Sequence, residues 1–89
     1  MTRSEFILYE LLSRYTLRQD IERQKRMSAI GLINSRCSVY VVENLAAGEI
    51  LYNKRGEGWP DVITVIVDRA NDNVMISGSV ELGREIESF

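Results

Sequence analysis

The stretch VITVIVD, residues 62–68, decides the architecture expected for this chain of 89 residues. Every residue in it is apolar except Thr64 and the terminal Asp68. A half-buried strand alternates apolar and polar residues, whereas a continuous β-branched run is typical of a strand covered on both faces. We therefore expect a central strand here, with one face packed on a helix. The second cover would be the C-terminal tail, the end of the helix or another subunit.

Three further segments have the composition of strands. CSVYVVE (37–43) and EILYNK (49–54) are rich in β-branched and aromatic residues, and VMISGSVEL (74–82) alternates apolar and polar residues. The connections between these segments are short, which favours hairpins over parallel crossovers. Residues 37–82 are therefore predicted to form a three- or four-stranded antiparallel meander, followed by a tail over residues 83–89.

The N-terminal third of the chain has the signals of a helix. The residues TRSE fit a capping box, in which Thr2 and Glu5 exchange hydrogen bonds. At helical spacing, five side chains share one broad face: Ile7, Leu8, Leu11, Leu12 and Tyr15. We expect one long helix within residues 1–34, straight or bent near Thr16, packed on the sheet. The predicted fold is a single α+β domain over residues 1–89.

Composition and charge are those of a globular protein, with 45% hydrophobic and 27% charged residues. The net charge of −2 hides a split, because residues 1–36 carry +3 (seven basic, four acidic) and residues 37–89 carry −5 (four basic, nine acidic). This split could orient a partner, join two copies, or be neutralised within one fold. There is no membrane-spanning run or convincing signal peptide, and the single cysteine cannot form an internal disulfide. We expect a cytoplasmic protein.

The absence of histidine bears on catalysis. Without it the chain lacks the commonest general base and the commonest metal ligand. No phosphate-binding glycine motif occurs either. The clustered carboxylates near the C-terminus are expected to be solvated, and Cys37 is expected to be a buried strand residue. The chain is therefore predicted not to be an enzyme, with no catalytic, cofactor-binding or metal-binding residue.

The stretch TLRQDIERQKRM, residues 16–27, keeps a helical composition after the apolar pattern stops. Either the helix turns at Thr16 onto a new narrow stripe, or it runs past the sheet and meets solvent or another chain. Both arrangements place apolar side chains beside Arg and Gln, a combination that suits a protein interface. A tryptophan beside Pro60 could anchor a partner or fold back over the sheet edge. The predicted partner-binding residues are Leu17, Arg18, Ile21, Arg26 and Trp59.

From these patterns we expect a small protein-binding module, a homodimer, that regulates or inhibits a larger partner by occupying its surface. Small size and a single domain are compatible with accessory proteins of phages and mobile elements. The alternative is a nucleic-acid-binding accessory protein that uses Arg14, Arg18, Lys25 and Arg26. The first three of these lie within about 40° on an ideal helix. The i,i+4 pair Arg18–Glu22 and the sequence pI of about 5.1 favour the protein partner.

Overall fold

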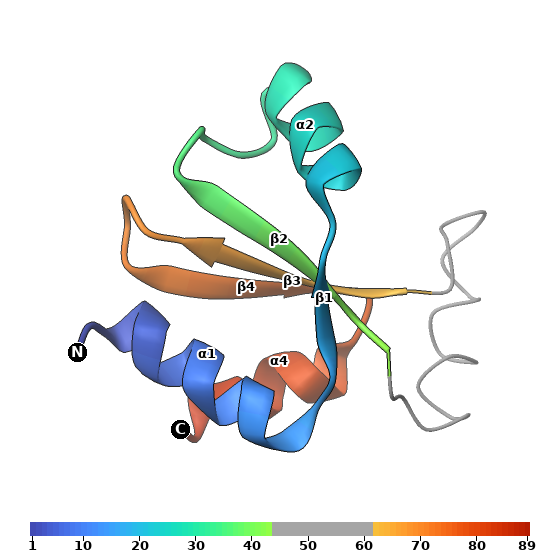
Figure 1. Ribbon diagram of the computed structural model, residues 1–89. Helices are drawn as coiled ribbons and strands as arrows, with labels where there is room; N and C mark the ends of the chain where they lie inside the picture. The colour runs from blue at the N-terminus through green and yellow to red at the C-terminus, as the bar shows by residue number, and fades with distance from the viewer. Residues whose placement is uncertain (44–61) are drawn as a thin grey trace.

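The computed structural model describes residues 1–43 and 62–89. Within these residues the fold is α+β with an antiparallel sheet, as expected, and the sheet has four strands in the order β1-β2-β3-β4 (Figure 1). Three of the strands lie within residues 37–82, where the meander was expected, and β1 comes from the segment expected to be helical. The elements are, in chain order, α1 (Arg3–Arg14), β1 (Leu17–Gln19), α2 (Ile21–Ala29), β2 (Cys37–Val42), β3 (Ile63–Asp68), β4 (Asn73–Ser77) and α4 (Val80–Glu87). The strand expected over residues 49–54 and the loop that holds Trp59 lie outside the described residues.

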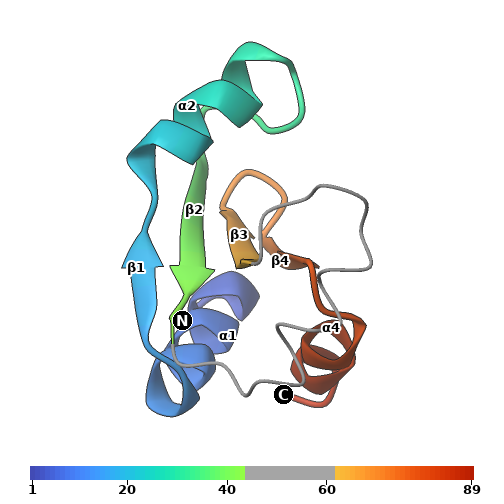
Figure 2. The same cartoon turned by 90° about the vertical axis from the view of Figure 1, so that its right-hand side faces the viewer.

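Strand β3 is the central strand that the apolar run predicted. It pairs with β2 on one side and with β4 on the other, so that Val65 lies between Tyr40 and Ile76. All six of its residues are buried. Helices α1 and α4 lie on one side of the sheet and α2 lies on the other, as Figures 1 and 2 show. The second cover is therefore a helix of the same chain.

The main core lies between the sheet and the layer formed by α1 and α4. Helix α1 contributes Ile7 and Leu11 to it, and α4 contributes Leu82 and Ile86. Leu11 is completely buried, which stabilises the fold by about 1.5–3 kcal/mol relative to an exposed leucine. Leu12 was expected on the same face, but it is 48% exposed. The inward face of α1 is thus narrower than the sequence pattern suggested.

A smaller core lies under α2, on the opposite face of the sheet. Met27 and Ile33 pack there against a buried cluster made of Cys37, Val39 and Ile66. Cys37 is buried in β2 as expected, and burial raises the pKa of its thiol. Helix α2 is therefore held to the sheet by Met27 and by Ile33, which belongs to the segment that follows the helix.

The single long helix expected within residues 1–34 is wrong. Helix α1 ends at Arg14, and residues 17–19 form β1, which pairs with the edge of β2. The backbone N–H of Glu43 donates to the Thr16 carbonyl at 2.9 Å, and the N–H of Asp20 donates to the Val39 carbonyl at 2.9 Å. These bonds satisfy backbone groups that the edge of β2 would otherwise leave unpaired, so sheet pairing overrides the local helix propensity.

The strand expected over residues 74–82 is shorter, and the expected tail is a helix. Strand β4 ends at Ser77, and Gly78 has a φ of 96°, a conformation that favours glycine. The Ser79 hydroxyl then accepts from the backbone N–H of Leu82 at 3.0 Å and caps α4. None of the helices in the described part of the chain has the length and apolar character that a bilayer crossing needs.

Candidate protein-binding surface

Helix α2 is capped by hydrogen bonds at both ends and contributes no side chain to the main core. At its start, the Asp20 carboxylate accepts from the backbone N–H of Arg23 at 2.9 Å, and this hydrogen bond lowers the pKa of Asp20. At its end, the N–H of Leu32 donates to the Met27 carbonyl at 2.9 Å and the N–H of Gly31 donates to the Ser28 carbonyl at 3.1 Å. This pair of bonds is a Schellman motif, and it requires the positive φ of 79° at Gly31.

Large apolar side chains on and after α2 lie in solvent. None of the nine residues of α2 is buried. Ile21 at its start is 47% exposed, and beyond its end Ile30 is 71% and Leu32 is 62% exposed. Ile33, by contrast, packs on the smaller core. The Schellman motif turns the chain so that Ile30 and Leu32, the exposed apolar pair, project into solvent, while Ile33 packs on the smaller core.

After Glu22, in the first turn of α2, the charged side chains of this surface are all basic. Residues 23–36 contain four basic side chains and no Asp or Glu: Arg23, Lys25, Arg26 and Arg36. Arg23 is neutralised by Asp20, with 3.2 Å between its Nε and a carboxylate oxygen. Lys25 and Arg26 form no ion pair with any residue in the described ranges and are exposed. The surface around the exposed apolar pair is therefore positively charged.

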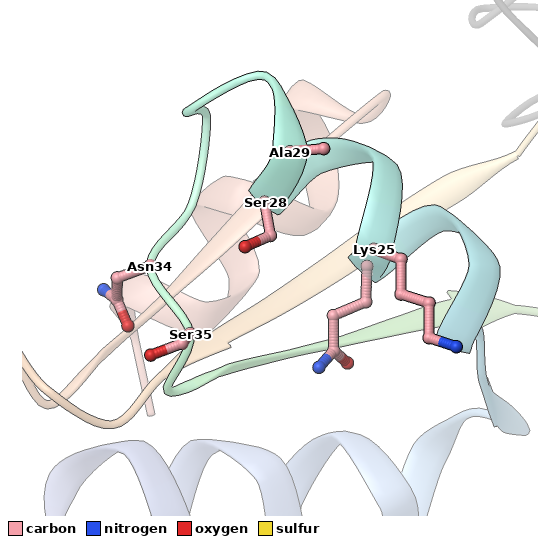
Figure 3. A pocket seen from close by; sticks show the side chains of 6 residues that line it. Lys25, Ser28, Ala29, Asn34 and Ser35 are labelled. Carbon is pink, nitrogen blue, oxygen red and sulfur yellow. The ribbon is translucent and has the colours of Figure 1, made fainter.

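A pocket of about 400 Å³ lies beside the end of α2 (Figure 3). One wall is α2 itself, and the other is the segment that returns to β2. Its six lining residues are Gln24, Lys25, Ser28, Ala29, Asn34 and Ser35. The first four come from the helix and the last two from the returning segment. Residues 30–33 join the two walls, so the exposed apolar pair belongs to the turn beside this pocket.

A buried carboxylate holds the second wall in place. The side-chain amide of Asn34 donates to a carboxylate oxygen of Asp68 at 3.2 Å, and its oxygen accepts from the backbone N–H of Arg36 at 2.8 Å. Asp68 also accepts from the side-chain amide of Asn71 at 2.9 Å. Hydrogen bonds from Asn71 and Asn34, in that order, lower the pKa of Asp68. The wall is thereby tied to the turn between β3 and β4.

The partner-binding residues predicted from the sequence lie in different environments. Leu17 is half-buried in β1 and packs against the main core. Arg18 lies on the same strand in an exposed ion pair with Glu43, at 2.7 Å. Ile21 and Arg26 lie exposed on α2. Trp59 is outside the described residues.

The basic residues considered for nucleic acid do not share one helix face. Arg14 belongs to α1, on the opposite side of the sheet from α2 (Figure 1). Its guanidinium forms ion pairs with Glu10 and Glu85, each at 3.4 Å, and lies 4.2 Å from the centroid of the Phe89 ring. The stripe with Lys25 required a continuous helix, and β1 interrupts it.

Sequence reasoning missed the apolar pair at the turn. Residues 29–33 read AIGLI, in which Gly31 has the position of a helix stop signal. The available signal was two large apolar residues flanking a C-terminal glycine. Their exposure depends on the direction in which the turn leaves the helix, which the sequence does not show.

Comparisons of the chain with protein-family models, with curated proteins and with solved structures found no significant match. Within residues 1–43 and 62–89, no group of three or more Cys, Asp or Glu side chains is placed to hold a metal ion.

Proposed function

We propose that this chain is a small non-enzymatic protein-binding module, which regulates or inhibits a larger partner by occupying one of that partner's surfaces. The observation that carries the proposal is the exposure of α2 and its turn. This element buries none of its helical residues and displays Ile21, Ile30 and Leu32 in solvent.

The energetics of exposed apolar side chains support a protein partner. Covering a large aliphatic side chain contributes about 1.5–3 kcal/mol, and two or three such anchors can dominate an interface. Ile30 and Leu32 are separated in sequence by Gly31 alone, and the hydrogen bonds of the Schellman turn hold both side chains in solvent. Such a convex apolar tip suits insertion into a concave surface of another protein.

We also propose that the module is a homodimer through the outer side of α1. Phe6, Tyr9 and Leu12 are exposed there at i,i+3 spacing. In an antiparallel pair with Tyr9 on the two-fold axis, Phe6 of one copy would lie opposite Leu12 of the other. This self-complementary pattern is what an isologous interface requires. Light scattering coupled to size exclusion tests it, because Tyr9→Glu should convert dimers to monomers, and a wild-type monomer would refute it.

Nucleic-acid binding is the second candidate, because residues 23–36 carry four basic side chains and no acidic one. Arg14 and Arg18 are already paired with carboxylates, so Lys25 and Arg26 would carry this function. Binding would then weaken steeply with salt, since each neutralised phosphate releases counterions. Charge reversal at Arg26 should abolish it.

The decisive experiment is capture from native-host lysate with the tagged chain, with and without nuclease, read by mass spectrometry. Ile21→Asp should abolish capture of a partner protein while leaving the circular dichroism spectrum unchanged. Val80→Asp is the matched control, because Val80 is an exposed apolar residue on α4 in the opposite layer. Retention by Val80→Asp and loss by Ile21→Asp, both with nuclease present, would support the proposal. Capture that disappears with nuclease would favour nucleic acid, and equal capture by both variants would remove α2 from the interface.

A further inference from the structure

We propose that the pocket beside α2, together with the apolar turn that joins its walls, binds an acidic and apolar peptide segment of the partner. A carboxylate of the segment would occupy the pocket, and a neighbouring apolar side chain would cover Ile30 and Leu32. This inference rests on the proposed protein-binding function and specifies the chemistry of the partner.

Polar side chains in the lining of the pocket can donate hydrogen bonds to a carboxylate. Ser28 and Ser35 contribute hydroxyls, and Lys25 adds a positive charge on α2, with its ammonium directed away from the returning segment (Figure 3). The side-chain oxygen of Gln24 already accepts from the backbone N–H of Val39 at 3.3 Å, so its NH2 group is the part left to donate. No acidic side chain is among the six lining residues. An ionised carboxylate is an acceptor only, and charge-assisted hydrogen bonds to it are the stronger kind.

The apolar turn adds a second, independent contact at the same place. Ser28 and Ala29 on one wall and Asn34 and Ser35 on the other are joined by residues 30–33. A segment that places a carboxylate between these walls therefore carries its neighbouring residues past the turn. A peptide with alternating acidic and apolar side chains would fit both the pocket and the apolar turn. The two together therefore give the surface a preference for such peptides that neither has alone.

Charge around the pocket favours an acidic peptide over other ligands. Lys25, Arg26 and Arg36 are exposed, and residues 23–36 hold no carboxylate, so Glu22 in the first turn of α2 leaves this surface with a net positive charge. A nucleic-acid strand would satisfy these charges but would leave Ile30 and Leu32 against a phosphate backbone. The residues forming this surface also include no aromatic side chain on which a base could stack.

The site is pre-organised, which reduces the entropy lost on binding. The Schellman bonds at Gly31 fix the turn, and Ile33 anchors it on the smaller core. The hydrogen bond from Asn34 to the buried Asp68 fixes the second wall. Binding therefore requires little rearrangement of the backbone.

Titration of the full-length ¹⁵N-labelled chain with a short synthetic peptide of alternating glutamate and leucine tests the inference. Amide shift changes should concentrate in residues 24–36. Leu32→Ser should weaken binding about tenfold, and Lys25→Ala should weaken it about threefold, the effect of losing one exposed positive charge beside the pocket. Val80→Ser is the matched control and should leave the affinity unchanged, because exposed Val80 belongs to α4, which lies on the other side of the sheet (Figure 1).

Two comparison peptides and two other probes define the outcomes that would overturn the inference. A lysine–leucine peptide and a glutamate–serine peptide should each bind at least tenfold more weakly than the glutamate–leucine peptide. Equal binding of either, or shift changes centred outside residues 24–36, would overturn it. So would equal or tighter binding through residues 24–36 of a single-stranded oligonucleotide or of anionic phosphatidylserine vesicles.

The failure of this site can be distinguished from failure of the proposed function. If wild type captures a nuclease-resistant partner and Lys25→Ala captures it equally well, the module binds protein through another part of its surface. If wild type captures no protein under any condition, the protein-binding function itself is refuted.

Discussion

Asp72 and Ser4 join the turn between β3 and β4 to the first helix. The Asp72 carboxylate accepts from the backbone N–H of Ser4 at 2.9 Å and from its hydroxyl at 2.8 Å, across 68 positions of sequence. The N–H of Arg3 donates to the same carboxylate at 3.3 Å. A negative charge at a helix N-terminus also interacts favourably with the helix dipole. The main layer is thus tied to the sheet by polar contacts as well as by its apolar core.

Asp72→Ala should therefore lower the urea midpoint of unfolding. The variant loses the carboxylate that accepts from the backbone N–H groups of Arg3 and Ser4, and it places alanine at a φ of 53°, where asparagine and aspartate are better tolerated. Asp72→Asn should cause a smaller loss, because its amide oxygen keeps an acceptor and the residue tolerates this backbone conformation. If both variants unfold at the wild-type urea midpoint, the carboxylate contacts with Ser4 do not contribute to stability.

Acid should destabilise the fold at a pH set by carboxylates that accept hydrogen bonds. Donation by Ser4 lowers the pKa of Asp72, and donation by Asn71 lowers that of Asp68. A folded-state pKa below the unfolded value contributes stability at higher pH, and this stability is lost as the pH falls through the folded pKa. Stability should therefore be nearly constant between about pH 5 and 8, since the chain has no histidine, and should fall below about pH 4.

Urea unfolding across this pH range provides the measurement. Asp72→Asn should flatten the acid limb, because it removes one of the titrating groups. A stability change near neutral pH, or an acid limb that Asp72→Asn leaves unchanged, would contradict the assignment.

Substitution of two glycines should have opposite effects. An added Cβ would meet no atom within 4 Å at either Gly31 or Gly83, so backbone conformation alone decides the result. Gly31→Ala should destabilise by about 1–2 kcal/mol, because its φ of 79° is strained for alanine. Gly83→Ala lies within α4 and should stabilise by about 0.5–1 kcal/mol. Chemical denaturation of both variants tests the Schellman turn, and a neutral Gly31→Ala would refute it.

Two adjacent leucines test the orientation of α1. Leu11 is 0% exposed and Leu12 is 48% exposed. Leu11→Ala should cost about 2–5 kcal/mol of unfolding free energy, the range for a fully buried leucine. Leu12→Ala should cost less than about 1 kcal/mol in the monomer, because half of its side chain is already in solvent. Equal losses in dilute solution would mean that α1 is rotated relative to the sheet.

The central strand and its antiparallel neighbours could be predicted from local sequence. Strand β3 is apolar on both faces except at Thr64 and Asp68, a pattern that predicts the full burial seen in the fold. The first helix was likewise predictable, because the capping box of Thr2 and Glu5 forms as expected. In these segments the local preference and the tertiary environment favour the same structure.

Tertiary contacts determine the secondary structure of the segments in which local helix and strand preferences are weak or conflicting. Residues 17–19 have helical composition, yet they form β1 because the edge of β2 offers backbone partners that a helix could not use. The apolar residues after Gly78 alternate like a strand, yet they form α4 because Ser79 caps a helix that packs Leu82 and Ile86 into the core.

The candidate binding surface likewise depends on contacts between segments that are distant in the sequence. The apolar centre of the sheet and the first helix follow from local sequence, because apolar patterning and capping act within a few residues. The position of α2 and the exposure of Ile30 and Leu32 follow from long-range contacts, because both depend on pairing between segments distant in the chain.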